Sequence, residues 1–168
     1  MFDYTLLHWT GFLMAAIVLN LAPGPDIAFI LGQTVRGGRK SGFAAMAGIW
    51  TGAFGHVLMA AAGLSAILAT SAVAFSMVKW AGAVYLIWLG IQAIRSGGGK
   101  FIAEDVKTTP SLLPIYRQGM IVALLNPKVA IFFLAFLPQF VVAGAGPVWA
   151  QLFLHGVLII VVAAFIEP

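Results

Sequence analysis

Three long segments of the sequence are almost free of charge. Residues 4–35 contain Asp26 as their one charged side chain, residues 41–94 contain Lys79, and residues 118–166 contain Lys128. A helix needs about 20 apolar residues to cross a hydrocarbon layer of about 30 Å, so the second and third segments are each long enough for two crossings. We therefore predict an all-α integral membrane protein with five visible transmembrane helices, at about residues 6–35, 41–66, 72–94, 118–140 and 148–166.

The composition excludes several classes of protein. Of the 168 residues, 62% are hydrophobic and 8% are charged, whereas soluble domains are about 45–50% apolar and about 25% charged. The formal net charge of +4 reflects a shortage of acids rather than a basic patch, so no nucleic-acid partner is expected. Without cysteine there is no disulfide framework, thiolate metal site or cysteine nucleophile. We expect neither a cofactor nor a metal.

The distribution of lysine and arginine predicts the orientation in the membrane. Seven of the nine basic residues lie in the segments 36–40 and 95–117, and the other two lie inside spans. Short loops rich in Lys and Arg remain in the cytoplasm. We therefore expect both segments to be cytoplasmic and the N-terminus to lie outside. The glycine triplet at 97–99 is not followed by the GK[ST] of a phosphate-binding loop.

Two motifs indicate an internal repeat. The pattern W-x3-F-x-H begins at Trp50 and again at Trp149, an offset of 99 residues. The pattern P-x-[IV]-A begins at Pro25 and again at Pro127, an offset of 102 residues. Because both matches occur in the same order at nearly the same offset, we predict a duplicated unit of three spans.

A unit with an odd number of spans re-enters the membrane from the opposite side, which gives the 3+3 inverted repeat common in secondary transporters. The first repeat would cover residues 1–94, a cytoplasmic linker residues 95–117, and an incomplete second repeat residues 118–168. The third span should recur at about 171–193, beyond Pro168. We therefore expect a transporter that lacks its sixth helix. The chain should insert into the membrane, but either it does not transport or it needs a further copy of itself in a homo-oligomer to complete the bundle.

Two spans contain helix-breaking residues. The first is interrupted at Asn20, Pro23, Gly24 and Pro25, and the fourth at Asn126 and Pro127. Proline removes a backbone donor and clashes with the preceding turn, while Pro25 suits the first position of a new half-helix. Paired interruptions in two halves are typical of a transporter's binding site, although each could also be a packing kink.

Asp26 and Lys128 are the charges closest to these breaks. Asp26 lies nine residues before Val35, and Lys128 lies ten after Gln118, so both are about 14 Å deep at 1.5 Å per residue. Opposite charges at one depth cost less when paired, so a purely structural ion pair is the alternative to a site. The candidate residues for substrate binding and coupling are Asp26, Lys128, Asn126, Asn20, Pro23, Gly24, Pro25 and Pro127.

Two histidines are candidates for a proton relay. His56 and His155 occupy equivalent positions in the repeated motif, and imidazole titrates near neutral pH. Each could instead make one hydrogen bond between helices. Lys79 is long enough to extend its ammonium to the outer interface, and the Gly48-x3-Gly52 pattern favours close helix packing.

The sequence resembles the LysE/RhtB family of bacterial amino-acid exporters in three motifs. These are Leu21-Ala22-Pro23-Gly24-Pro25, then Lys79-x2-Gly82-x2-Tyr85-Leu86-x2-Leu89-Gly90 closing at Arg95, and Asn126-Pro127-Lys128 with Phe132-Phe133 and Phe136-Leu137-Pro138-Gln139-Phe140. The resemblance implies a permease of the bacterial cytoplasmic membrane that expels amino acids or related small solutes, driven by the proton gradient. Members of that family are longer and have a sixth span.

Two other classes of function remain as alternatives. An intramembrane aspartyl protease needs two buried carboxylates, and Asp26 is the one acid within the predicted spans. The serines at 65, 71 and 76 lie in no nucleophile signature, so an enzyme is not expected. A non-transporting membrane scaffold would explain the apolar spans but not two matched helix breaks.

Overall fold

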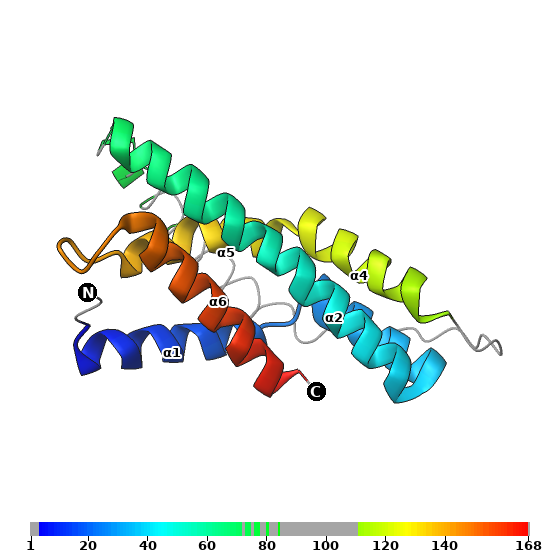
Figure 1. Ribbon diagram of the computed structural model, residues 1–168. Coiled ribbons are helices and arrows are strands. Elements are labelled where there is room, and N and C mark those ends of the chain that lie inside the picture. The colour runs from blue at the N-terminus through cyan, green and yellow to red at the C-terminus, as the bar shows by residue number, and fades with distance from the viewer. Residues whose placement is uncertain are drawn as a thin grey trace.

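The computed structural model describes residues 4–71, 73, 74, 76, 77, 80, 84 and 111–167. Within these residues the elements are all helical and no strand occurs (Figure 1). They are α1 (Leu6–Leu21), α2 (Pro25–Thr70), α4 (Leu112–Leu125), α5 (Pro127–Phe136), the short 3-10 helix η1 (Leu137–Phe140) and α6 (Val148–Ile166). Most of the predicted third span and of the linker, including Lys79 and the glycine triplet, lies outside the described residues.

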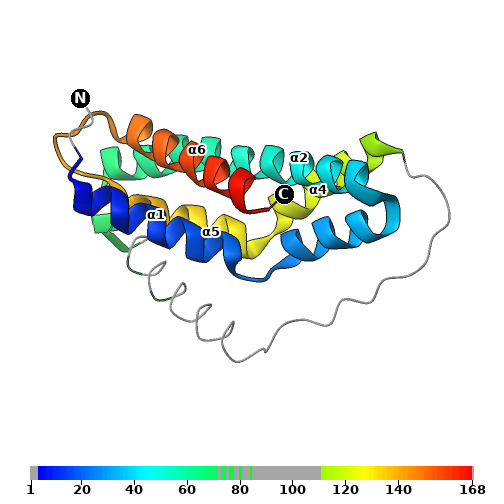
Figure 2. The same cartoon turned by 90° about the horizontal axis from the view of Figure 1, so that it is seen from below.

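Helix α2 consists of two limbs that meet at Gly38. This glycine has φ 71° and ψ −172°, a conformation outside the helical region, and glycine adopts positive φ without steric cost. Figure 2 shows the chain turning back between the two limbs. The basic segment predicted at 36–40 is therefore a tight turn rather than a loop. Arg36 and Arg39 lie on either side of its two glycines.

The described helices confirm the predicted all-α membrane architecture. Helix α1 with the first limb of α2 forms the broken first span, the second limb forms the second, and α6 forms the fifth with the predicted bounds. Helix α4, helix α5 and the following η1 form the fourth span, which is bent by 53° at the break between α4 and α5. By length and apolar composition, Pro25–Ile67 and Val148–Ile166 can each cross a membrane, as can the bent pair taken together; α1 is a shorter apolar helix.

Two helix ends differ from the prediction. Helix α4 begins at Leu112 instead of residue 118, and α2 continues to Thr70 instead of ending at 66. Pro114 lies in the first turn of α4, where a missing backbone N–H leaves no bond unmade. Hydropathy locates the membrane boundary, whereas a helix continues beyond it until its backbone is capped. The last part of the predicted linker is therefore helical.

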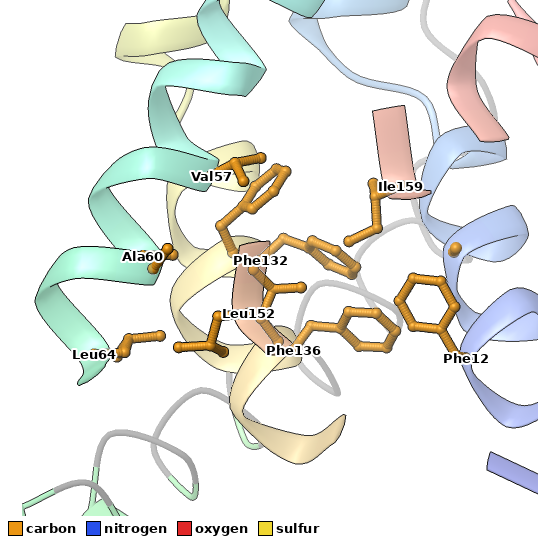
Figure 3. Packing of buried hydrophobic residues seen from close by; sticks show 12 residues of the cluster. Phe12, Val57, Ala60, Leu64, Phe132, Phe136, Leu152 and Ile159 are labelled. Carbon is orange, nitrogen blue, oxygen red and sulfur yellow. The ribbon is translucent and has the colours of Figure 1, made fainter. Parts of the chain in front are cut away.

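A cluster of aromatic and aliphatic side chains joins α1, α2, α5 and α6 (Figure 3). Phe136 stacks on Phe132 with ring centroids 4.3 Å apart and on Phe12 at 6.0 Å. On the outer surface, Leu7 and Phe165 are 82% and 84% exposed. Large apolar side chains facing outward are costly in water but not in hydrocarbon, so the outer surface suits contact with lipid.

Helix α6 runs antiparallel to the second limb of α2 (Figure 2). A Cβ atom built on Gly156 would lie 2.7 Å from the Val57 side chain, so glycine permits this close approach. The two W-x3-F-x-H motifs face each other, with the Phe54 and Phe153 rings 6.0 Å apart. An antiparallel pair is compatible with an inverted repeat, which stays a prediction.

Helices α2 and α4 pack through the glycines that the sequence marks for close approach. A Cβ atom on Gly52 would lie 2.6 Å from the Met120 carbonyl oxygen, and one on Gly48 would overlap the Tyr116 carbonyl oxygen. From the other side, Gly119 lies against the Ala45 carbonyl. Because backbone atoms form these contacts, rotation of a side chain cannot relieve a clash.

We expect Gly48→Ala to destabilise the protein by about 3 kcal/mol, the upper end of the range for overpacking a tight contact. The methyl group would force α4 away from α2. The measurement is thermal unfolding in detergent. The matched control is Gly63→Ala on the same helix, where an added Cβ meets no atom within 4 Å. Equal unfolding temperatures for the two variants would contradict the predicted packing.

Candidate functional site

The two predicted breaks each start a new helix at a proline. Helix α2 begins at Pro25 after the N-cap Gly24, and α5 begins at Pro127 after the N-cap Asn126. The Asn126 side chain accepts a hydrogen bond from the backbone N–H of Lys128 at 3.0 Å. Proline at this position removes an N–H that would have no partner inside the helix. Figure 2 shows both breaks near the middle of the bundle's length.

The charged side chains lie at helix ends of suitable polarity. The Lys128 ammonium donates to the backbone carbonyl of Ala22 at 2.5 Å, and Ala22 is the C-cap of α1. Asp26 lies in the first turn of α2. Cations are favoured at the negative C-terminal end of a helix and anions at the positive N-terminal end. The breaks therefore hold both charges at places where backbone dipoles stabilise them.

Asp26 and Lys128 are neighbours, but in the part of the chain that the structure describes they form no direct ion pair. A Cβ atom on Gly24 would lie 2.5 Å from Asp26 Oδ1 and 3.1 Å from Lys128 Nζ, so both groups border this glycine. The Asn126 amide Nδ2 lies 3.5 Å from Asp26 Oδ1. The sequence favours a direct pair between the two charges. In the structure Asp26 instead contacts the Asn126 amide, and Lys128 contacts the Ala22 carbonyl at the C-terminal end of α1. Any side chain at residue 24 would disrupt these contacts.

A cavity of about 40 Å³ lies where the breaks meet α6 and the second limb of α2. Its polar lining residues are Asn20, Asp26, Trp50, Lys128 and Glu167. Its apolar lining residues are Leu19, Ile49, Ala53, Val129, Phe133, Ile159, Ile160 and Ala163. Helices α1, α2, α5 and α6 all contribute, so a change at the cavity can affect each of them.

Glu167 and Trp50 are polar lining residues of this cavity that the sequence did not predict as site residues. The predicted bounds of the fifth span, 148–166, put Glu167 at its cytoplasmic end, apart from Asp26 and Lys128. In the structure Glu167 Oε2 accepts a hydrogen bond from the Trp50 indole N–H at 2.7 Å. The scarcity of acids, five in the sequence, was the signal that could have marked it.

The other predicted site residues lie close to the cavity. The Asn20 side chain donates to the Ala16 carbonyl at 2.9 Å and lies 3.5 Å from the Ile159 carbonyl of α6. Pro23, Pro25 and Pro127 are exposed and shape the breaks rather than line the cavity. Asn126 is buried, with 3% of its surface exposed.

The two candidate relay histidines lie away from the cavity lining. His56 Nε2 is 3.2 Å from the Ala123 carbonyl of α4, and its ring stacks on Phe133. The contact is a single hydrogen bond between helices, which favours a structural role over a relay.

His155 belongs to an aromatic cluster on the first half of α6, with Tyr4, His8, Trp9, Phe12 and Phe140. Its Nδ1 is 2.8 Å from the Gln151 carbonyl, and its Nε2 is 2.8 Å from Nε2 of His8. Since a carbonyl only accepts, Nδ1 carries the proton; in the neutral pair His155 Nε2 then accepts from His8. The sequence did not predict this pair, which ties α1 to α6.

Comparison with known proteins identifies the family of the chain. Residues 17–166 match the LysE type translocator family. The chain is 36% identical over 157 residues to proteins named homoserine/homoserine lactone efflux protein from Salmonella typhi and from Salmonella typhimurium strain LT2, covering 92% of this chain and 74% of each relative. It is 30% identical over 158 residues to an uncharacterized membrane protein of Vibrio cholerae serotype O1, covering 94% and 76%. No solved structure is significantly similar. The chain thus belongs to the LysE type translocator family and is an integral membrane transporter.

Proposed function

We propose that this protein exports amino acids or closely related small amines from the cytoplasm, and that the cavity between the helix breaks is the substrate site. The observation that carries the proposal is the placement of Asp26 and Lys128 beside one cavity at two half-helix starts. The relatives named for homoserine and homoserine lactone efflux support the same class of substrate.

Each charged group of a free amino acid has a partner in this site. The substrate ammonium would bind Asp26, and its carboxylate would bind Lys128 or the backbone N–H groups at the start of α2. Substrate would thereby replace Asn126 beside Asp26, and the Ala22 carbonyl beside Lys128. Breaking these contacts would loosen α1 from α5, which links binding to movement of the helices.

The cavity has to open during transport. Its volume of about 40 Å³ holds about three water molecules, since each needs about 10–15 Å³. We propose that an amino acid enters only when this cavity widens, as one step of an alternating-access cycle. We propose that a proton taken up by Asp26 displaces the substrate ammonium, which couples export to the proton gradient as an antiport.

Export should be tested first by growth rescue. Cells that express the protein would be challenged with toxic amino acids, amino-acid analogues and their lactones, and intracellular levels would be measured. An exporter lowers these levels, whereas a scaffold leaves them unchanged. An enzyme would convert the compound instead of moving it intact to the medium.

We further propose that the protein lies in the bacterial inner membrane with its N-terminus outside and the turn at Gly38 in the cytoplasm. A cysteine introduced at Gly38 should then resist an impermeant maleimide added to intact cells, because the membrane separates the two. The matched control is Gly144, which also has positive φ and lies in the turn before α6. Cysteine at 144 should be labelled readily; the reverse pattern would mean the opposite orientation.

A further inference from the structure

Among the residues that the structure describes, three ionisable side chains line the cavity, and their charges do not cancel. Asp26 and Glu167 are acids, and Lys128 is the base. Asp26 and Lys128 compensate each other and lie at helix ends that favour their charges. Glu167 faces them with a neutral hydrogen-bond donor, the Trp50 indole, as its direct partner. An ionised Glu167 would therefore leave the cavity with one uncompensated negative charge.

An uncompensated charge enclosed among apolar side chains is costly. Removing an ion from water costs several kcal/mol unless an opposite charge comes with it. Glu167 can avoid this cost in two ways: its carboxyl group keeps a proton, or a cation binds next to it. The neutral Trp50 indole as the direct partner of Glu167 agrees with the first of these for the empty cavity.

We propose that the cavity exchanges the proton of Glu167 for a monocationic primary amine, a small solute that keeps its ammonium while its carboxyl is masked as a lactone, ester or amide. This rests on the proposed export function and deepens it: for a cationic substrate, the exchanged proton is that of Glu167 rather than that of Asp26. In the exchange the Glu167 O–H bond breaks and the proton leaves to water, while an ammonium N–H donates to the freed carboxylate. The cavity holds the same total charge before and after.

A zwitterionic amino acid fits this charge balance less well. Its net charge is zero, so a cavity that has released the Glu167 proton would keep an excess negative charge. Its carboxylate would also have to draw Lys128 away from the Ala22 carbonyl. By contrast, the apolar lining formed by Ile49, Val129 and Phe133 suits a ring or chain without a second charge. The cavity therefore favours the masked form over the free amino acid.

Proton release on binding tests the inference without any mutation. The full chain in detergent at about pH 6, where an α-amino group is protonated, would be titrated with homoserine lactone and with homoserine in weakly buffered solution. We expect about one proton released per lactone bound and almost none per homoserine, and lactone affinity rising up to tenfold per pH unit. The control γ-butyrolactone lacks the ammonium and should neither bind nor release protons.

Two substitutions locate the effect. Glu167→Gln should abolish proton release and reduce lactone transport driven by a pH gradient in liposomes by at least about tenfold, while homoserine binding persists. Trp50→Phe removes the indole donor that stabilises the Glu167 carboxylate. It should therefore raise the pH at which lactone binding reaches half its maximum, and reduce lactone affinity at a fixed pH by less than tenfold. Its matched control, Trp149→Phe, changes the repeat-related tryptophan outside the cavity, which is 58% exposed, and should match the unmodified protein.

The outcomes separate the inference from the function on which it rests. If neither amine binds or moves, the proposed export of amines fails as well. If both move but lactone binding releases no proton, or if Glu167→Gln keeps the proton release, the exchange at Glu167 is wrong and export stands. Should Glu167→Gln not fold, the proton count on the unmodified protein still decides.

Discussion

Replacing Asp26 by asparagine should abolish substrate export while the protein still reaches the membrane. Asparagine keeps the size of the side chain and can still contact the Asn126 amide, which lies 3.5 Å from Asp26 Oδ1. It cannot carry the negative charge that binds an ammonium or accept the coupling proton. Losing one partner of a desolvated charge pair costs about 2–5 kcal/mol, and each 1.4 kcal/mol is a factor of ten, so export should fall by at least about 30-fold.

The measurement is efflux from preloaded cells, normalised to the amount of protein in the membrane fraction. The matched control is Gln118→Glu, the opposite amide-to-acid change at an exposed position of α4 outside the cavity. It should transport normally. Full export by Asp26→Asn at normal membrane levels would show that the carboxylate has a structural role or none, and it would remove Asp26 from the proposed site.

The helix breaks could be predicted because their causes are local. Pro25 and Pro127 prevent a continuous helix in any tertiary context, and Asn126 suits an N-cap. The spans followed from the spacing of Asp26, Lys79 and Lys128, which needs no knowledge of packing. The prediction extended to the bounds of α6, where a turn with two glycines and Pro147 precedes the apolar run.

The position of Glu167 could not be predicted because it depends on where helices of different length end. Counting residues assumed that each span begins and ends at the membrane surface. The second limb of α2 and helix α4 extend past the end of α6, and the C-terminal end of α6 lies level with the breaks (Figure 2). Glu167 thereby meets Trp50, which the sequence marked as part of a repeat but not of a site.

The pairing of His8 with His155 was missed for a related reason. The two residues are 147 positions apart, and no local pattern joins them. His155 was recognisable through its repeat partner His56, whereas His8 has no counterpart in the repeat. The contact between His8 and His155 follows from the packing of α1 against α6, which no motif in the sequence indicates.

Exchanging the two charges separates a structural pair from a binding site. In the double variant Asp26→Lys with Lys128→Asp, a purely structural ion pair would survive, because Coulomb attraction does not depend on which residue carries which sign. The helix ends around these residues do depend on it. Lysine at 26 would place a cation at the positive start of α2, and aspartate at 128 would place an anion near the Ala22 carbonyl at the negative end of α1.

We therefore expect the double variant to reach the membrane at higher levels than Lys128→Asp alone, since two opposite charges again balance, but to export at less than about 1% of the unmodified rate. Lysine would then stand at the position where Asp26 binds the substrate ammonium. The substrate would have to bind in the opposite orientation, which the dipoles of the helix ends disfavour. The measurement is membrane level and efflux for both single variants and the double variant. Recovered export in the double variant would favour a structural pair, and it would place the substrate away from Asp26 and Lys128.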